Sequence, residues 1–143
     1  MPFTRFNYSV AEFILFPPAR DRAAVLSRKL NGKTILITGA SYGIGESLAY
    51  LLANSGAHLI LVARSGEKLQ EVQSAIARNG GRSTCIPTDI AVPEQVSALL
   101  AQLCKLDRVD IVVNNAGKSI MRPVMESLGR LHDFSRTMAV NYR

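Results

Sequence analysis

The sequence contains no tryptophan, only two cysteines and no long hydrophobic run, and the last two features each exclude a class of protein. Cys85 and Cys104 stand far apart, without metal-ligand or C-x-x-C spacing, which excludes a disulfide scaffold. No stretch of about eighteen uncharged apolar residues is present, so we expect no membrane-spanning helix. Charge runs are absent too and 48% of the residues are hydrophobic, which excludes a chain that is disordered throughout. A chain of 143 residues with this composition is enough for one domain with a core.

The net charge of +6 comes from the two ends of the chain. Residues 1–30 and residues 118–143 each carry five Lys or Arg against two acids, whereas residues 31–117 carry seven of each. No Lys/Arg run or interleaved aromatic pattern accompanies this excess, so we expect no nucleic-acid partner. Two scattered cysteines suit a reducing compartment, and we therefore expect a cytoplasmic protein.

Residues 1–30 differ from the rest and are interpreted as an N-terminal arm. An aromatic-rich stretch ends at Pro17-Pro18 and is followed by several basic residues. Glu12 interrupts the apolar stretch and no clean cleavage site follows, which argues against a secretory signal. Two interpretations stay open. The arm packs on its own domain or on a partner, or residues 1–18 make a peripheral contact with a membrane, with arginines at the headgroups.

From residue 33 onward, short apolar runs alternate with amphipathic helical patterns. The runs at 34–37, 58–63, 83–87 and 109–113 are typical of buried strands. Ser65 is an expected helix cap, Pro93 an expected helix start, and one helix is expected to turn Val96, Leu99, Leu100 and Leu103 inward. This order predicts an α/β fold over residues 31–143. The expected architecture is a Rossmann-like doubly wound parallel sheet, incomplete, with about four strands present.

A glycine-rich turn lies between the first expected strand and the first expected helix. It reads Thr38-Gly39-Ala40-Ser41-Tyr42-Gly43-Ile44-Gly45, with Gly-x-x-x-Gly-x-Gly spacing in place of the common Gly-x-Gly-x-x-Gly. Gly39 permits a tight exit from the strand, and a side chain at Gly43 would obstruct the approach of a pyrophosphate. Gly45 lets the helix lie close to the sheet, while free N–H groups and the helix dipole favour an anion. The turn therefore predicts a phosphate-binding site.

A second cluster, Val112-Val113-Asn114-Asn115-Ala116-Gly117, ends the fourth expected strand, beside the first. That edge is where ligands bind in open α/β sheets. Together the two motifs strongly resemble those of the short-chain dehydrogenases/reductases, over residues 31–143. The resemblance implies a truncated Rossmann domain that binds a nicotinamide dinucleotide, with Asn114 helping to tie the central strands together.

The resemblance also implies roles for individual residues. Asp89 would reach the adenine amino group, with a simple helix cap as the alternative. Asn141 would support a proton relay through water, with an ordinary polar helix residue as the alternative. The full expected cofactor-binding set is Gly39, Ser41, Tyr42, Gly43, Ile44, Gly45, Arg64, Asp89, Asn115, Ala116 and Gly117.

The end of the second expected strand indicates which nicotinamide cofactor is used. NAD sites usually place a carboxylate there, but this chain has Ala63 followed by Arg64. An arginine offers planar donors and a permanent charge to a 2′-phosphate, which favours NADP(H). Tyr42 stands where NADP-preferring relatives often carry a second basic residue, so that support is missing. A solvated arginine that merely begins a helix is the alternative for Arg64.

The chemistry of the family needs a tyrosine and a lysine at Tyr-x-x-x-Lys and an upstream serine. No tyrosine of this chain has that lysine: Tyr8, Tyr42 and Tyr50 precede Glu12, Glu46 and Asn54, and Tyr142 is the penultimate residue. We therefore expect the chain to be the cofactor-binding part of a longer oxidoreductase and to be inactive alone, with Asn141 its only catalytic residue, in a supporting role. We also expect no metal site.

Residues 118–143 resemble a subgroup that includes bacterial fatty acyl-CoA reductases and membrane-associated relatives. The expected substrate is a small carbonyl or alcohol compound or an acyl thioester, and the resemblance implies a homo-oligomer for a full-length protein. Two further readings stay open. The chain is a non-catalytic regulatory module that binds NADPH, or it is a membrane-associated pseudoenzyme.

Overall fold

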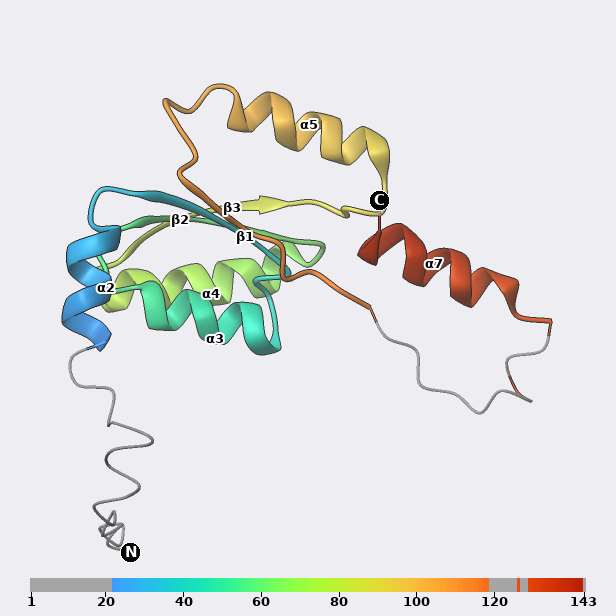
Figure 1. Ribbon diagram of the computed structural model, residues 1–143, viewed down its shortest axis with the longest axis horizontal. Coiled ribbons are helices and arrows are strands. Elements are labelled where there is room, and N and C mark those ends of the chain that lie inside the picture. The colour runs from blue at the N-terminus through green and yellow to red at the C-terminus, as the bar shows by residue number, and fades with distance from the viewer. Residues whose placement is uncertain (1–21, 119–125, 127–128, 143) are drawn as a thin grey trace, which may run out of the picture.

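The computed structural model describes residues 22–118, 126 and 129–142 (Figure 1). Within them, strands and helices alternate along the chain as the sequence predicts. The elements in order are α2 (Arg22–Leu30), β1 (Thr34–Thr38), α3 (Gly43–Leu52), β2 (His58–Ala63), α4 (Gly66–Arg78), β3 (Arg82–Pro87), α5 (Pro93–Leu103), β4 (Ile111–Val113) and α7 (Leu131–Asn141).

The four described strands form one parallel sheet in the order β3-β2-β1-β4. In register, Ile35 of β1 pairs with Leu59 of β2 on one side and with Ile111 of β4 on the other. The chain thus builds the sheet outward in one direction from β1, then crosses back to place β4 on the opposite side of β1. This order confirms the expected Rossmann-like fold.

Helices cover both faces of the sheet (Figure 1). Successive side chains of a strand point to opposite faces. Ile35 and Ile37 accordingly join the core under α3 and α4, whereas Leu36 packs with Leu99 of α5 on the other face. The core under α3 and α4 is the larger, because α4 contributes three buried residues and α5 only Leu99.

Two expectations about the second half of the sheet need correction. Leu100 is 55% exposed, not inward, because Leu99 is the residue of α5 that faces the sheet and the next residue points away around the helix. The fourth strand begins at Ile111, not at residue 109. Among the described residues, β1 is the only strand that pairs with β4, and Val112 of β4 is 54% exposed.

The expected N-terminal arm is described only over its last nine residues, which form α2. This helix ends against the domain: Leu30 packs on the larger core, and the Ser27 hydroxyl donates to the carbonyl of Asn54. The proposed membrane-contacting residues 1–18 lie outside the described residues. In the part of the chain that is described, every helix is too short or too polar to cross a bilayer.

Candidate functional site

A pocket of about 810 Å³ opens at the carboxyl ends of the strands. It lies over β1, which has β2 on one side and β4 on the other. The strand order reverses direction at this point, and open α/β sheets bind ligands at such a switch point. Every strand end contributes to its walls. The lining residues are Gly39, Ser41, Tyr42, Gly43 and Ile44 after β1; Val62, Ala63, Arg64 and Ser65 at the end of β2; Thr88, Asp89 and Ile90 after β3; Asn115, Ala116, Gly117 and Lys118 after β4; and Val140 of α7.

The glycine turn comes into close contact with the segment that follows β4. Gly39 has a φ of 69°, and a Cβ there would lie 2.9 Å from Cα of Ala116. Gly45, in the first turn of α3, is buried below the pocket and does not line it. A Cβ on Gly45 would collide with the carbonyl oxygen of Gly39 and lie 2.5 Å from Nδ2 of Asn115. Both glycines are therefore needed for close packing, whereas Gly43, with φ 63°, has open space around it.

Thr38 and Asn115 join the ends of β1 and β4. The Thr38 hydroxyl oxygen accepts hydrogen bonds from the backbone N–H groups of Asn115 and Ala116, each at 3.0 Å. Nδ2 of Asn115 donates to the carbonyls of Thr38 and Gly39, at 3.1 and 3.3 Å. Asn115, not Asn114, therefore ties the central strands. Thr38 was missed as a site residue, although its place before Gly39 at the strand end was the available signal.

The pocket carries more positive than negative charge. Arg64 follows β2 directly and is exposed, and within the described residues its guanidinium makes no hydrogen bond or ion pair. Lys118, which sequence reasoning did not select, adds a second cation, against the single carboxylate of Asp89. Two cations against one anion favour an anionic ligand.

Asp89 lines the pocket and also shapes the loop before α5. Its Oδ1 accepts from the N–H of Ala91 at 3.0 Å, and its own N–H donates to Gln95 at 2.7 Å. The N-cap residue of α5 is Val92, so Asp89 is not the simple helix cap of the alternative reading.

Asn141 binds the main chain just past the pocket wall. Its Nδ2 donates to the carbonyl of Lys118 and its Oδ1 accepts from the N–H of Lys118, both at 2.9 Å. Asn141 does not line the pocket, but its neighbour Val140 does. The asparagine therefore holds α7 to the end of β4, beside Gly117.

Neither Tyr42 nor Tyr50 has the environment that a tyrosine needs for acid-base catalysis of carbonyl reduction. Tyr42 lines the pocket but is 84% exposed. Tyr50 donates a hydrogen bond to Glu46, and partial burial together with that bond raises the pKa of the phenol. A catalytic phenol needs the opposite shift. Among the described residues, no group of three or more His, Cys, Asp or Glu could hold a metal ion.

Comparison with known proteins gives the same picture. The sequence profile of the family described as short chain dehydrogenase matches residues 33–143. The chain is 46% identical, over 120 residues, to a fatty acyl-CoA reductase of Acinetobacter baylyi, covering 83% of this chain and 41% of that protein. It is 41% identical, over 123 residues, to a fatty acyl-CoA reductase of Mycobacterium tuberculosis, covering 85% and 42%. The chain thus spans about two fifths of the length of these relatives.

Solved structures share the fold. A metagenomic short-chain oxidoreductase in complex with NADP has a TM-score of 0.70 and 32% identity, over 78% of this chain and 51% of that chain. A 3-oxoacyl (acyl-carrier-protein) reductase from Agrobacterium tumefaciens with NADP bound has a TM-score of 0.72 and 28% identity, over 89% and 48%.

Proposed function

Because the chain belongs to the short-chain dehydrogenase family, we propose that it carries the NADP(H)-binding part of an oxidoreductase. One observation supports this most directly. The glycine turn after β1 and the segment 115–117 after β4, the two motifs of the sequence, lie against each other and line the same pocket. Only Gly45 and Asn141 of the expected residues lie behind the pocket wall, and each packs directly against it.

The residues around the glycine turn fit a dinucleotide. Helix α3 begins at Gly43, and its N-cap residue Tyr42 supplies no side-chain hydrogen bond. The first N–H groups of a helix have no intrahelical acceptor, so those at the start of α3 are available to a pyrophosphate. The absence of side chains at Gly39 and Gly43 leaves backbone in direct view of that anion. In this proposal the carboxylate of Asp89 receives the adenine amino group.

Arg64 is proposed to select NADP(H) over NAD(H). It stands at the end of β2, and its guanidinium has no partner among the residues that the structure describes. A carboxylate at this place would bind ribose hydroxyls and repel a 2′-phosphate. Two solved structures with the same fold have NADP bound, which supports NADP(H) as the cofactor proposed here. The bound nicotinamide would supply or accept the hydride, and Arg64 would contribute only to binding and selectivity.

Calorimetric titration of Arg64→Asp with NADPH and NADH tests the proposal. A charge-assisted bond to phosphate is worth about 1.5–3 kcal/mol, so we expect NADPH to bind about 10- to 100-fold more weakly. NADH binding should change much less. Arg78→Asp is the matched control. Arg78 lies in the last turn of α4, the helix that begins just after Arg64, and it does not line the pocket. An unchanged preference in Arg64→Asp would refute the role of Arg64.

For the complete enzyme we propose hydride transfer to or from a carbonyl, an alcohol or an acyl thioester. The two fatty acyl-CoA reductases favour the thioester. This chain lacks a Tyr-x-x-x-Lys pair, so we expect it to bind NADPH without consuming it when fatty acyl-CoA or aldehydes are added. Oxidation of NADPH by the purified chain would contradict this part of the proposal. A regulatory module that only senses NADPH would show binding without turnover in every longer form of the protein as well.

Self-association is the further property proposed for the complete protein. Leu131, Phe134 and Met138 are exposed at helical spacing along one side of α7. A contiguous exposed apolar stripe is typical of an interface. Sedimentation analysis tests this, with Phe134→Ser expected to shift an oligomer toward monomer. A monomeric wild-type protein at high concentration would contradict it.

A further inference from the structure

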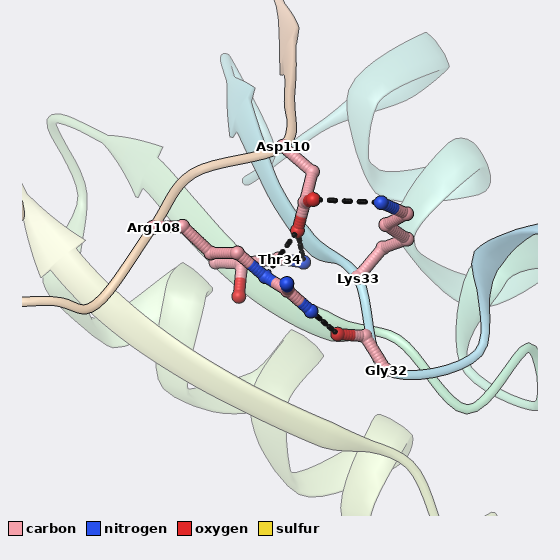
Figure 2. A network of polar contacts seen from close by, with 5 residues as sticks. All are labelled: Gly32, Lys33, Thr34, Arg108 and Asp110. Carbon is pink, nitrogen blue, oxygen red and sulfur yellow. Dashed lines mark hydrogen bonds and ion pairs between the residues drawn. The ribbon is translucent and has the colours of Figure 1, made fainter.

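A compact polar network lies at the end of the sheet remote from the pocket (Figure 2). Its centre is Asp110, the residue before β4, whose side chain is only 12% exposed. Its Oδ1 accepts a hydrogen bond from Nζ of Lys33 at 2.8 Å. Its Oδ2 accepts from the N–H of Thr34 at 2.8 Å and lies 3.3 Å from Nε of Arg108. Nη2 of Arg108 donates in turn to the carbonyl of Gly32 at 3.0 Å.

The network connects two parts of the chain that are far apart in sequence. Lys33 precedes β1 and Thr34 is its first residue, whereas Arg108 and Asp110 lie in the segment before β4. Asp110 also uses its backbone, because its N–H donates to the carbonyl of Thr34 at 2.9 Å. Both backbone groups of Thr34 are therefore bonded to the same residue. Together these contacts fix where β4 starts relative to β1.

This start matters because β4 has little else to hold it. The strand has three residues, none of them fully buried, and in the described part of the chain it pairs with β1 alone. Its far end is joined to β1 through Thr38 and Asn115. The strand is therefore pinned at two points, Asp110 at the start and Asn115 at the pocket.

The register of β4 sets the shape of the pocket. Shifting a strand by one residue turns each of its side chains to the other face. A shift in β4 would take Asn115 out of reach of Thr38 and Gly39. It would also change the fit of Ala116 against Gly39, which is so close that a Cβ added to Gly39 would lie 2.9 Å from Cα of Ala116. The wall formed by residues 115–117 thus depends on the pairing that Asp110 begins.

We propose that Asp110 is a positioning residue for the nucleotide pocket, acting through the register of β4 without touching the ligand. The inference rests on the proposed function, because NADPH is its probe. It predicts that a change at the remote end of the sheet alters the pocket. The charged groups that face Asp110 are Lys33 and Arg108, so removing either partner weakens the same arrangement.

The test compares Asp110→Asn with Asp107→Asn in the full chain. Both variants remove one carboxylate from the segment that connects α5 to β4, but Asp107 is exposed and is outside the network. NADPH affinity is measured by calorimetry at a temperature where circular dichroism shows each variant to be folded. We expect Asp110→Asn to weaken NADPH binding about three- to tenfold, within the range for remote coupled residues. Asp107→Asn should bind as wild type does.

Hydrogen exchange supplies a readout that does not depend on the ligand. We expect faster exchange at the amides of Asn115 and Ala116 in Asp110→Asn, with exchange at Leu61 of β2 unchanged. If Asp110→Asn does not fold, Lys33→Met is used, because it removes one partner and leaves the carboxylate on Thr34. The same two changes in smaller size are then expected.

Two failures are distinguishable. If wild-type protein binds no NADPH, the proposed function is wrong, and exchange at residues 115–117 alone decides the inference. If wild type binds NADPH, the inference is overturned when Asp110→Asn binds within about twofold of wild type and exchange at 115–117 is unchanged. A variant that only lowers the melting temperature, with affinity and local exchange intact, gives Asp110 a purely structural role and also overturns it.

Discussion

Replacing Gly45 by alanine tests the close packing beneath the pocket, because two physical effects predict opposite signs. Gly45 lies in the first turn of α3, and helix propensity alone favours alanine over glycine by up to about 1 kcal/mol. The added Cβ, however, would collide with the carbonyl oxygen of Gly39 and lie 2.5 Å from Nδ2 of Asn115. Neither atom can move away easily, since one is backbone and the other is hydrogen-bonded to the carbonyls of Thr38 and Gly39.

Overpacking of this kind costs about 1–3 kcal/mol. After the gain in propensity, we expect Gly45→Ala to lower the free energy of unfolding by about 1–2 kcal/mol. For a chain of this size the melting temperature should fall by about 3–8 °C. Urea and thermal unfolding, followed by circular dichroism, measure both quantities.

Gly66→Ala is the matched control for this experiment. Gly66 is also an N-terminal residue of a helix, but a Cβ there would meet only the ring of Pro87, at 3.3 Å. Its unfolding free energy should stay within about 0.5 kcal/mol of wild type, because crowding and propensity roughly cancel. If Gly45→Ala proves as stable as wild type, or more stable, the argument from close approach is refuted.

Three further predictions follow from other residues. Gly43→Ala should cost about 1 kcal/mol of stability through its positive φ, yet weaken NADPH binding in calorimetry far more than that; equal binding would contradict the phosphate role of the turn. The hydrogen bond from Lys33 holds the pKa of Asp110 below its usual range, so its stabilising effect is present above about pH 4 and lost as pH falls through the lowered pKa. The stability difference between wild type and Asp110→Asn should therefore be constant from about pH 7 to 5 and shrink below about pH 4. An increase in that difference at acidic pH would contradict this prediction. Burial raises the pKa of the Cys85 thiol, which donates to the carbonyl of Leu69, so maleimide should label the exposed Cys104 first, as mass spectrometry of the labelled peptides would show.

The fold was predictable because its strands and helices carry strong local signals. Ser65 accepts a hydrogen bond from the N–H of Lys68 as the cap of α4, and Pro93 begins α5, both as the sequence indicates. Leu100 was wrongly expected inside, because an apolar residue next to the buried face of a helix has the same local pattern as one within it. The length of β4 was also overestimated, because the apolar pattern was taken to begin the strand at residue 109. Asp110 instead lies before the strand and bonds to Thr34 through its side chain as well as its backbone.

The site was predictable where it depends on motifs and unpredictable where it depends on contacts between distant segments. The glycine turn and residues 115–117 carry recognisable spacing, and the structure brings them together. The bonds of Thr38 and Asn115, by contrast, join residues far apart in the chain. No local pattern states which of two adjacent asparagines turns toward β1. Lys118 was missed for the same reason, because its place in the pocket depends on the path of the chain after β4.

The most direct test of the central claim is a titration of the 15N-labelled chain with NADPH, followed by amide chemical shifts. We expect the largest shifts on Ser41–Gly45 after β1, on Arg64, and on Asn115–Gly117 after β4, with the start of β3 unaffected. Shifts confined to other parts of the chain, or none at millimolar NADPH, would contradict the claim that these two motifs form a nucleotide site.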